Sequence, residues 1–452
     1  MSGNFSGPYR PRKKNSARTY GSKRTAPSQA FPSSRASRRT SFLPLWLRIF
    51  VVLALVAAII LVLVFGIKSC RKGPSTPSVG TQTDLGLTNT FSSPSDPNVV
   101  QREWSVPEIL PNPGLSRVIA HGAANVNFSE NQINTPGVNG NEIFFSAGTG
   151  SVDSDILKKL YLYDLETKKE TKIAESTMYK GCYYETLVNP KWIVWIETDH
   201  GTNNHIYVRN RETDVVSRLR SCPNGIPKLR LSDDVLIWME QVEKGLDKLY
   251  MVDLKSQENI TLFSFQDVAT YGVSAPCVYD DWIVWAGPDL AQSEAERKEN
   301  ETSCIYYVKL GVDFGDEGVI PRKFTPKTYV HEPLFNGQVF VWIDSNKSPS
   351  SNLYISTPTS EPLIIASNIT TYALGEDIVI YGKNEGIWGY IYSTGETVRL
   401  TAPGEKGIMP SITGRTVIWY NLSAGGDKDV LRYKMLSDEN LYPKGVPNAA
   451  QG

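Results

Sequence analysis

A short apolar run, usually ending in tryptophan, recurs along most of this 452-residue chain. It reads "PKWIVW", "DDWIVW", "GQVFVW" or "GRTVIW" in successive copies. The runs end at Phe145, Trp195, Trp238, Trp285, Trp342, Ile380 and Trp419, at intervals of 50, 43, 47, 57, 38 and 39 residues. A period of 40–50 residues built from short strands is typical of propeller blades.

Each copy contains signals for four strands. A proline often stands nine residues before the end of the run, as do Pro136, Pro276, Pro333 and Pro410. A turn such as "NGN" or "YDD" comes between, and its Gly, Asn and Asp residues tolerate the positive φ of tight hairpins. An alternating strand such as "KLYMVDL" and a fourth short strand follow the run. Each copy therefore predicts a four-stranded antiparallel meander.

The predicted fold is an all-β, seven-bladed propeller of four-stranded antiparallel blades, spanning residues 116–440. Runs such as "WIVW" are apolar throughout, which is expected for strands that are covered on both faces. The last copy lacks a good fourth strand, whereas "LSRVIAHG" near the start resembles one. We therefore expect Ser116–Ala120 to complete the last blade and close the ring.

The N-terminal region carries different signals. Residues 1–48 are predicted to be a disordered tail, because the first 42 hold ten Lys and Arg and no acids. Residues 49–67 are nineteen uncharged, mainly apolar residues, close to the roughly 20 that a membrane-spanning helix needs. Residues 68–115 are predicted to be a flexible linker, and 441–452 a C-terminal tail. Lipidation at Cys70 is the alternative to a spanning helix.

The charge distribution predicts orientation. Basic residues stay on the cytoplasmic side of a membrane, so we expect a single-pass protein with a cytoplasmic N-terminus and an extracytoplasmic propeller. The lipid bilayer is then one partner, through the helix and the basic tail. The tail has few aromatic residues to stack on bases, so we expect no nucleic-acid partner.

The run "KLYLYDLETKKETKI", following an aromatic-anchored strand, resembles the repeats of TolB-like propellers. Those are similar in turn to propeller domains of the dipeptidyl-peptidase IV type. The resemblance covers about residues 115–440, and the turns differ, since "SDD", "YDD" or "NGQ" replaces the usual "SPDG". It implies a propeller that binds proteins or peptides.

Two groups of polar residues are candidates for a binding face. The first follows the apolar runs by two residues and comprises Glu197, Glu240, Asp344 and Asn421. In equivalent blades these would form a ring of oxygens for a cation or a basic partner, or alternatively solvated loop starts. The second lies in the long "GPDLAQSEAERKENETS" loop, where a helical protrusion would carry Glu294, Glu296 and Arg297.

Four cysteines lie in the predicted extracytoplasmic domain, where disulfides can persist. They are Cys182, Cys222, Cys277 and Cys304. Sequence alone allows three pairings. The expected positions at blade entries favour Cys182–Cys222 and Cys277–Cys304.

Signals for catalysis are weak. The chain has four histidines and neither HExxH nor GxSxG, so we predict no catalytic residues, no metal site and no cofactor. The sequence favours a non-catalytic module or scaffold that binds a protein, a peptide or a cell-envelope polymer. The alternative is a glycan lyase or hydrolase whose polar residues converge on the propeller axis.

Overall fold

The structure is a computed structural model that describes residues 108–111, 116–148, 157–199, 201–243, 245–266, 274–289, 295, 303–311, 313–315, 318–319, 321–324, 329–345, 351–422 and 429–442. The predicted cytoplasmic tail, the predicted helix at 49–67 and most of the predicted linker lie outside these ranges. Within them, no helix is both long and apolar enough to cross a membrane.

Five separate four-stranded antiparallel sheets account for most of the described strands. The first holds β3 (Gln132–Asn139), β4 (Glu142–Gly148), β5 (Lys159–Asp164) and β6 (Glu170–Glu175). The second holds β7 (Cys182–Val188), β8 (Trp192–Thr198), β9 (Asn204–Asn210) and β10 (Val216–Ser221). The third holds β11 (Lys228–Ser232), β12 (Val235–Glu243), β13 (Leu246–Asp253) and β14 (Asn259–Gln266).

The fourth sheet holds β15 (Cys277–Tyr279), β16 (Trp282–Pro288), β17 (Ser303–Lys309) and β20 (Arg322–Phe324), beside a small hairpin of β18 (Phe314–Gly315) and β19 (Gly318–Val319). The last sheet holds β28 (Gly407–Thr413), β29 (Thr416–Asn421), β30 (Leu431–Met435) and β2 (Ala124–Val126). It is followed by a one-turn helix, α3 (Asp438–Leu441). The predicted four-stranded meanders are confirmed in the first four of these sheets, and the last sheet takes its fourth strand, β2, from the start of the domain.

An eight-stranded sheet occupies the ring between the fourth and last sheets. It holds β21 (His331–Phe335), β22 (Phe340–Ile343), β23 (Ser351–Ser356), β24 (Leu363–Leu374), β25 (Ile378–Lys383), β26 (Gly386–Ile391), β27 (Glu396–Arg399) and β1 (Ser116–Val118). The first half of β24 pairs with β23, and the half from Ile369 onward pairs with β25. One long strand thus ends one meander and begins the next.

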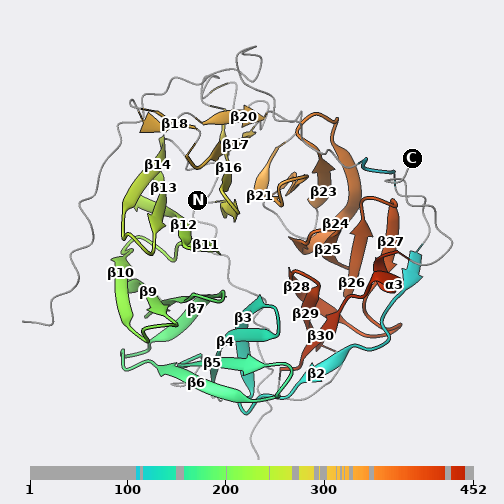
Figure 1. The fold of residues 1–452 in the computed structure, drawn as a ribbon, viewed down its shortest axis with the longest axis horizontal. Coiled ribbons are helices and arrows are strands. Elements are labelled where there is room, and N and C mark those ends of the chain that lie inside the picture. The colour runs from blue at the N-terminus through green and yellow to red at the C-terminus, as the bar shows by residue number, and fades with distance from the viewer. Residues whose placement is uncertain are drawn as a thin grey trace, which may run out of the picture. The chain divides into compact units, whose positions relative to one another are not determined.

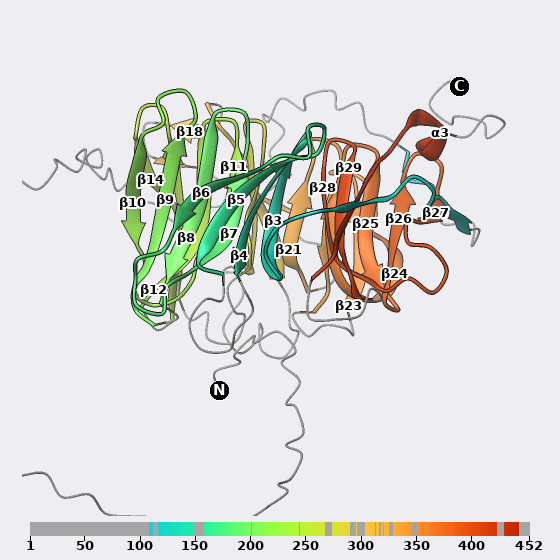
Figure 2. The ribbon, with the colours of Figure 1, turned by 90° about the horizontal axis from the view of Figure 1, so that it is seen from below.

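The sheets stand radially around a common axis, as the view along that axis shows (Figure 1). Seven inner strands contact one another in a closed circuit, in the order β3, β7, β11, β15, β21, β24, β28 and back to β3. Seen from the side, the strands run roughly along the axis (Figure 2). The short turns within hairpins therefore gather at the two ends of the ring.

The tryptophan-ended runs form the core between sheets. Trp238, Trp285 and Trp342 are completely buried. Each stacks on a tyrosine of the next strand, for example Trp342 on Tyr354 with ring centroids 5.5 Å apart. The predicted packing role of these tryptophans is confirmed. Replacing any one by alanine should cost about 3–5 kcal/mol of unfolding free energy.

Three of the four repeated prolines lie in β-bulges of the innermost strands. Pro136, Pro333 and Pro410 each stand where the register of the pair shifts. Proline cannot donate to a ladder, so within sheets it is confined to edges and bulges. Just before two of these prolines, Glu332 and Met409 adopt φ values of 51°. The proline signal therefore marks bends that curve the inner strands around the axis.

The prediction for ring closure is wrong by one strand. Ser116–Ala120 does not complete the last sheet: β1 instead pairs in parallel with β27, at the outer edge of the eight-stranded sheet. The fourth strand of the last sheet is β2, which pairs antiparallel with β30. The N-terminal strand does join the C-terminal sheet, through residues slightly further along the chain.

Candidate functional site

The three predicted ring acids are all described, and each accepts a hydrogen bond from a nearby side chain. Glu197 accepts a hydrogen bond from the Ser176 hydroxyl at 2.5 Å. Asp344 accepts bonds from the backbone and the side-chain amide of Asn352, both at 2.8 Å. The first contact joins the link after β6 to β8, and the other two fix the loop between β22 and β23.

The third acid, Glu240, joins two neighbouring sheets. It is only 4% exposed and accepts a hydrogen bond from Arg220 Nε at 2.6 Å. Arg220 comes from β10 of the second sheet, and its guanidinium lies 4.1 Å from the ring centroid of Tyr250 in the third. The Glu240 carboxylate, which was predicted to belong to a binding face, therefore neutralises a cation between two sheets.

The other predicted binding residues add little. Asn421 ends β29 opposite Gly407. Glu294, Glu296 and Arg297 lie outside the described residues, so the predicted protrusion stays a prediction. Across the described ranges, no group of three or more His, Cys, Asp or Glu side chains is arranged to hold a metal.

The predicted disulfides are wrong: all four cysteines are buried thiols. Cys182 lies in the innermost strand of the second sheet, and Cys222 follows the outermost strand, about 14 Å away at the usual strand spacing. Cys277 and Cys304 lie in β15 and β17, with β16 between them. A disulfide needs Cα atoms within about 7 Å. Burial raises the pKa of the Cys182 thiol to about 12.

Among the described residues a cleft lies between the second and third sheets, and the sequence did not predict it. It consists of two adjoining hollows of about 580 and 360 Å³ that share Trp192, Asn210 and Lys255. The larger, the polar hollow, is lined by Pro190, Lys191, Trp192, Asn210, Arg211, Glu212, Asp234 and Lys255. The smaller, the apolar hollow, is lined by residues of β9, β10 and β13, by Trp192 of β8, and by the turns that follow β9 and β13.

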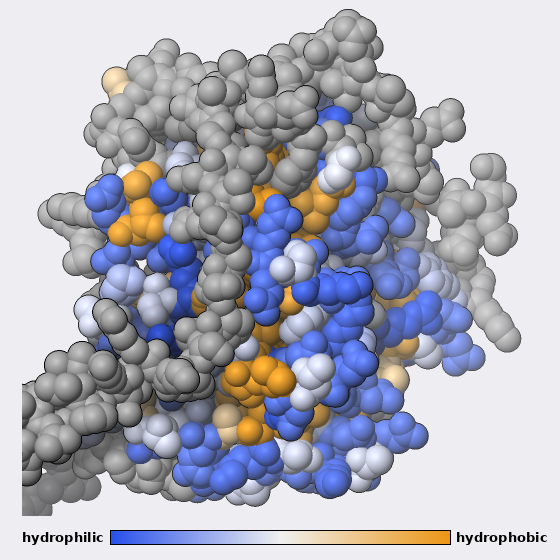
Figure 3. All heavy atoms as spheres, turned by 60° about the vertical axis from the view of Figure 1, so that its left-hand side comes forward, coloured by the Kyte–Doolittle hydropathy of each residue, from blue (hydrophilic) through white to orange (hydrophobic). Residues whose placement is uncertain are grey.

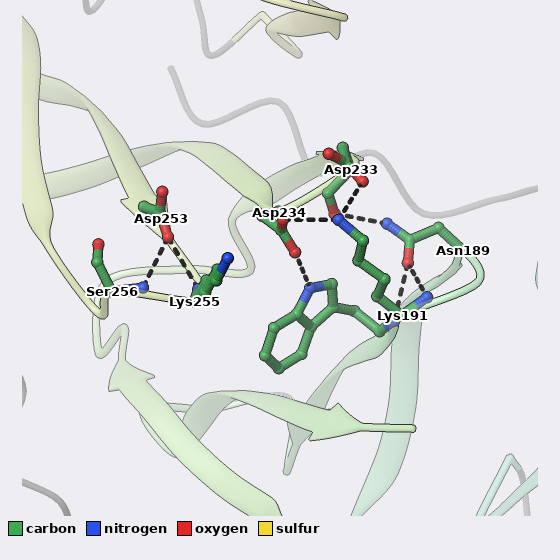
Figure 4. Close-up of polar contacts among 8 residues, drawn as sticks. Asn189, Lys191, Asp233, Asp234, Asp253, Lys255 and Ser256 are labelled. Atoms are coloured by element: carbon green, nitrogen blue, oxygen red, sulfur yellow. Dashed lines mark hydrogen bonds and ion pairs between the residues drawn. The ribbon is translucent and has the colours of Figure 1, made fainter. Parts of the chain in front are cut away.

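A turn before β8 positions the tryptophan of this cleft. The Asn189 carboxamide oxygen accepts hydrogen bonds from the backbone N–H groups of Lys191 and Trp192, at 2.9 and 2.8 Å. The Asn189 amide donates to the Asp233 carbonyl in the third sheet at 2.7 Å (Figure 4). This one side chain therefore shapes its own turn and ties it to the neighbouring sheet.

Charged groups complete the junction (Figure 4). Trp192 Nε1 donates to Asp234 at 2.8 Å, and Lys191 Nζ lies 2.8 Å from Asp233 and 2.7 Å from Asp234. The bonds from Lys191 and Trp192 hold the pKa of Asp234 below its usual value. Asp234 is therefore a carboxylate at neutral pH rather than a proton donor.

Matching turns after the third strands present the other side of the cleft. Asp253 accepts from the N–H groups of Lys255 and Ser256, both at 2.8 Å. In the same way, the Asn210 side chain at the end of β9 accepts from the N–H groups of Glu212 and Thr213. Four residues after each of these capping side chains the chain adopts a positive φ, at Asp214 and Gln257. Both blades thus have the same type of turn with different residues, and the turn after β13 places Lys255 at the rim of the cleft.

Most cations at the polar hollow are already neutralised. Arg211 makes a bidentate pair with Glu142 of the first sheet, at 2.8 and 2.6 Å. Lys255 is exposed and forms no ion pair with any residue that the structure describes. Among the cations at this rim, it is therefore the one that remains available to a ligand.

The apolar hollow faces the outer wall of the ring. Its floor comprises Trp192, Val208, Leu219, Val252 and Leu254. The described residues that line it include two cations, Arg218 and Lys255, and no carboxylate. On the side of the ring that carries β10 and β14, hydrophobic residues form small areas among hydrophilic ones (Figure 3). This hollow combines an apolar floor with a positive rim.

Comparisons with known proteins agree with this architecture. No protein-family model and no curated protein matches the sequence. Solved structures do: the β-propeller domain of the Trilobed protease from Pyrococcus furiosus has a TM-score of 0.51 at 12% identity, covering 70% of this chain and 98% of its own. The fold is a β-propeller. That domain is described as having an open velcro topology, whereas here β2 completes the last blade.

Two further structures show weaker likeness. An acylaminoacyl peptidase has a TM-score of 0.49 at 12% identity, covering 69% of this chain and 55% of its own. TolB from Acinetobacter baumannii has a TM-score of 0.38 at 10% identity, covering 65% of this chain and 64% of its own. This chain thus spans about half the length of the peptidase. At these identities the likeness concerns the fold alone.

Proposed function

We propose that this β-propeller is a non-catalytic binding module for a protein or peptide segment, which docks in the cleft between the second and third blades. One observation carries the proposal: the apolar hollow has a floor of aromatic and aliphatic side chains and a rim with two cations and no described carboxylate. Binding sites are typically concave and mostly apolar, with a few charged groups that give orientation.

The rival function, cleavage of a glycan, needs a protonated acid beside an ionised one. The acids that sequence analysis would have used are bonded elsewhere: Glu197 to Ser176, and Glu240 to Arg220. In the cleft itself, the pKa of Asp234 is lowered by its bonds to Lys191 and Trp192. This supports binding over acid–base chemistry.

The setting of the module is also part of the proposal. We propose that the helix predicted at 49–67 tethers the propeller to a membrane, with the propeller on the extracytoplasmic side and the basic tail at the lipid surface. We further propose that the eight-stranded sheet acts as two blades, which gives a seven-bladed ring. The closed circuit of seven inner strands supports that count.

The test is a selection of random twelve-residue peptides on the full-length protein. Two exposed residues of the cleft are changed together, Val215→Glu and Lys255→Glu, and Ile364→Glu provides a control on a similarly exposed strand residue outside the cleft. We expect peptides that bind the wild type and the control alike, and bind the double variant at least tenfold more weakly. The absence of any enriched peptide, or equal binding to all three proteins, would refute the proposal.

A further inference from the structure

The outer edge of this ring already accepts an added strand. Residues Ser116–Val118 lie in parallel beside Thr397–Arg399, although they come from the opposite end of the domain. The Ile119 N–H continues the contact by donating to the Arg399 carbonyl at 2.8 Å. Three residues of pairing are therefore enough to seat an extended segment against an outermost strand.

The outermost strand of the second blade, β10, offers a comparable edge. It is the last strand of its sheet, and no strand in the described part of the chain pairs with its outer side. The Asn210 N–H donates to the Val215 carbonyl, so Val215 and, by alternation, Ser217 direct their backbone groups toward β9. The backbone groups of Val216 and Arg218 then face outward. Val216 is also 50% exposed.

The side chains of β10 connect this edge to the apolar hollow. Ser217 and Leu219 of β10 line it, together with Val215 just before the strand, Trp192 and Leu254. In a sheet, neighbouring strands lie about 4.8 Å apart and their side chains alternate between faces. Every second side chain of a strand added to β10 would therefore lie over the outer rim of the hollow.

The charge of this edge selects the occupant. Arg218 and Lys255 are exposed, and among the described residues neither has an ion-pair partner. A symmetric pairing of β10 with β10 of a second copy would place the Arg218 side chains of both copies near one another on paired edges, where like charges are destabilising. An acidic segment gains from both cations instead.

We propose that an extended, acidic segment of a partner protein adds to β10 as a further strand, with its apolar side chains over the apolar hollow and its carboxylates near Arg218 and Lys255. This inference rests on the proposed function and specifies its ligand and binding mode. Backbone hydrogen bonds along the edge supply affinity in such strand addition, and alternate side chains supply specificity.

The first experiment tests the backbone contact. The probe is a fluorescein-labelled seven-residue peptide that alternates glutamate with leucine, and its binding to the full-length protein is followed by fluorescence anisotropy. Val216→Pro removes an N–H that β9 does not use, and edge strands tolerate proline. We expect at least tenfold weaker binding with an unchanged unfolding midpoint, whereas Val216→Thr keeps the N–H and the affinity.

The second experiment tests the charge. Arg218→Glu with Lys255→Glu should weaken the glutamate peptide at least tenfold and create binding of the matching lysine–leucine peptide. Added salt should weaken both complexes. Equal binding of the acidic and basic peptides to the wild type would overturn the inference, as would wild-type affinity in Val216→Pro.

These outcomes are separable from failure of the proposed function. Selected peptides that need Val215 and Lys255, but bind Val216→Pro and the single variant Arg218→Glu as tightly as the wild type, would leave a binding cleft without strand addition. A concentration-dependent dimer that disappears in Val216→Pro would assign the edge to a second copy and overturn the acidic partner.

Discussion

The strap that runs from β1 to β2 is predicted to stabilise the whole ring through one side chain. Arg117 in β1 makes a bidentate pair with Glu396 at 2.8 and 2.9 Å, and also donates to the Asn440 carbonyl at 2.8 Å. The two charged side chains are 29% and 17% exposed, so water screens them only in part. Arg117→Ala removes all three bonds.

The expected cost lies between two known limits. An exposed ion pair contributes about 0–1 kcal/mol, and breaking a fully buried pair costs about 3–5 kcal/mol. A partly buried bidentate pair with a third hydrogen bond should therefore cost about 2 kcal/mol. At about 2 °C per kcal/mol, the lower end of the range for large domains, the melting temperature should fall by roughly 4 °C.

The assay is thermal unfolding of the full-length protein, followed by tryptophan fluorescence. The matched control is Arg415→Ala, because Arg415 pairs with Asp438 at 2.6 Å while the two side chains are 44% and 76% exposed. That change should cost less than about 1 kcal/mol. If Arg117→Ala melts at the temperature of the wild type or of the control, the strap does not stabilise the ring through the Arg117 side chain.

Two further predictions concern the blades themselves. Asp247 is 2% exposed, and burial raises its pKa to about 6. Between about pH 4 and 6 the folded state therefore holds a proton that the unfolded state has lost. The free energy of unfolding should fall as pH rises through this range, by at most about 3 kcal/mol. Asp247→Asn should abolish that fall in urea titrations at successive pH values, and an unchanged slope would contradict it. In Gly137→Ala, the new Cβ would lie 2.4 Å from the Thr186 carbonyl oxygen of the next blade, so the urea midpoint should drop by the equivalent of about 1–3 kcal/mol; an unchanged midpoint would show that the two blades separate easily.

The sequence predicted the blades well because their central strands are buried on both faces. Trp238 and Trp285 are completely buried. Strands in such positions need apolar side chains, and the apolar runs are therefore visible in the sequence. It did not predict that two units share β24. Links between other units contain proline or glycine, which interrupt strands, as in "CPNGIP" before β11. The segment "SNITTY" inside β24 contains neither residue. The bend there comes from Asn368, at φ 58°.

The cleft could not be found in the same way, because its parts come from different repeats. Trp192 and its partner Asp234 are 42 residues apart, and each reads locally as part of a hairpin turn. Alignment of the repeats does contain a signal for this contact, because "NPKW" and "SDD" occupy the same turn in two consecutive units. Once the blades are placed side by side, the lysine of the first faces the acids of the second.

The error in ring closure has a physical cause that bears on how the propeller holds together. Strand prediction relied on alternation, and β2 is three residues long, too short to show a period. What fixes it is contact from β30: Arg432 donates to the Ala123 carbonyl at 2.8 Å, and Lys434 donates to the His121 carbonyl. Val126 is then buried between the first and last blades. Because these contacts join both ends of the domain, the last blade cannot open without also releasing the strap that Arg117 holds.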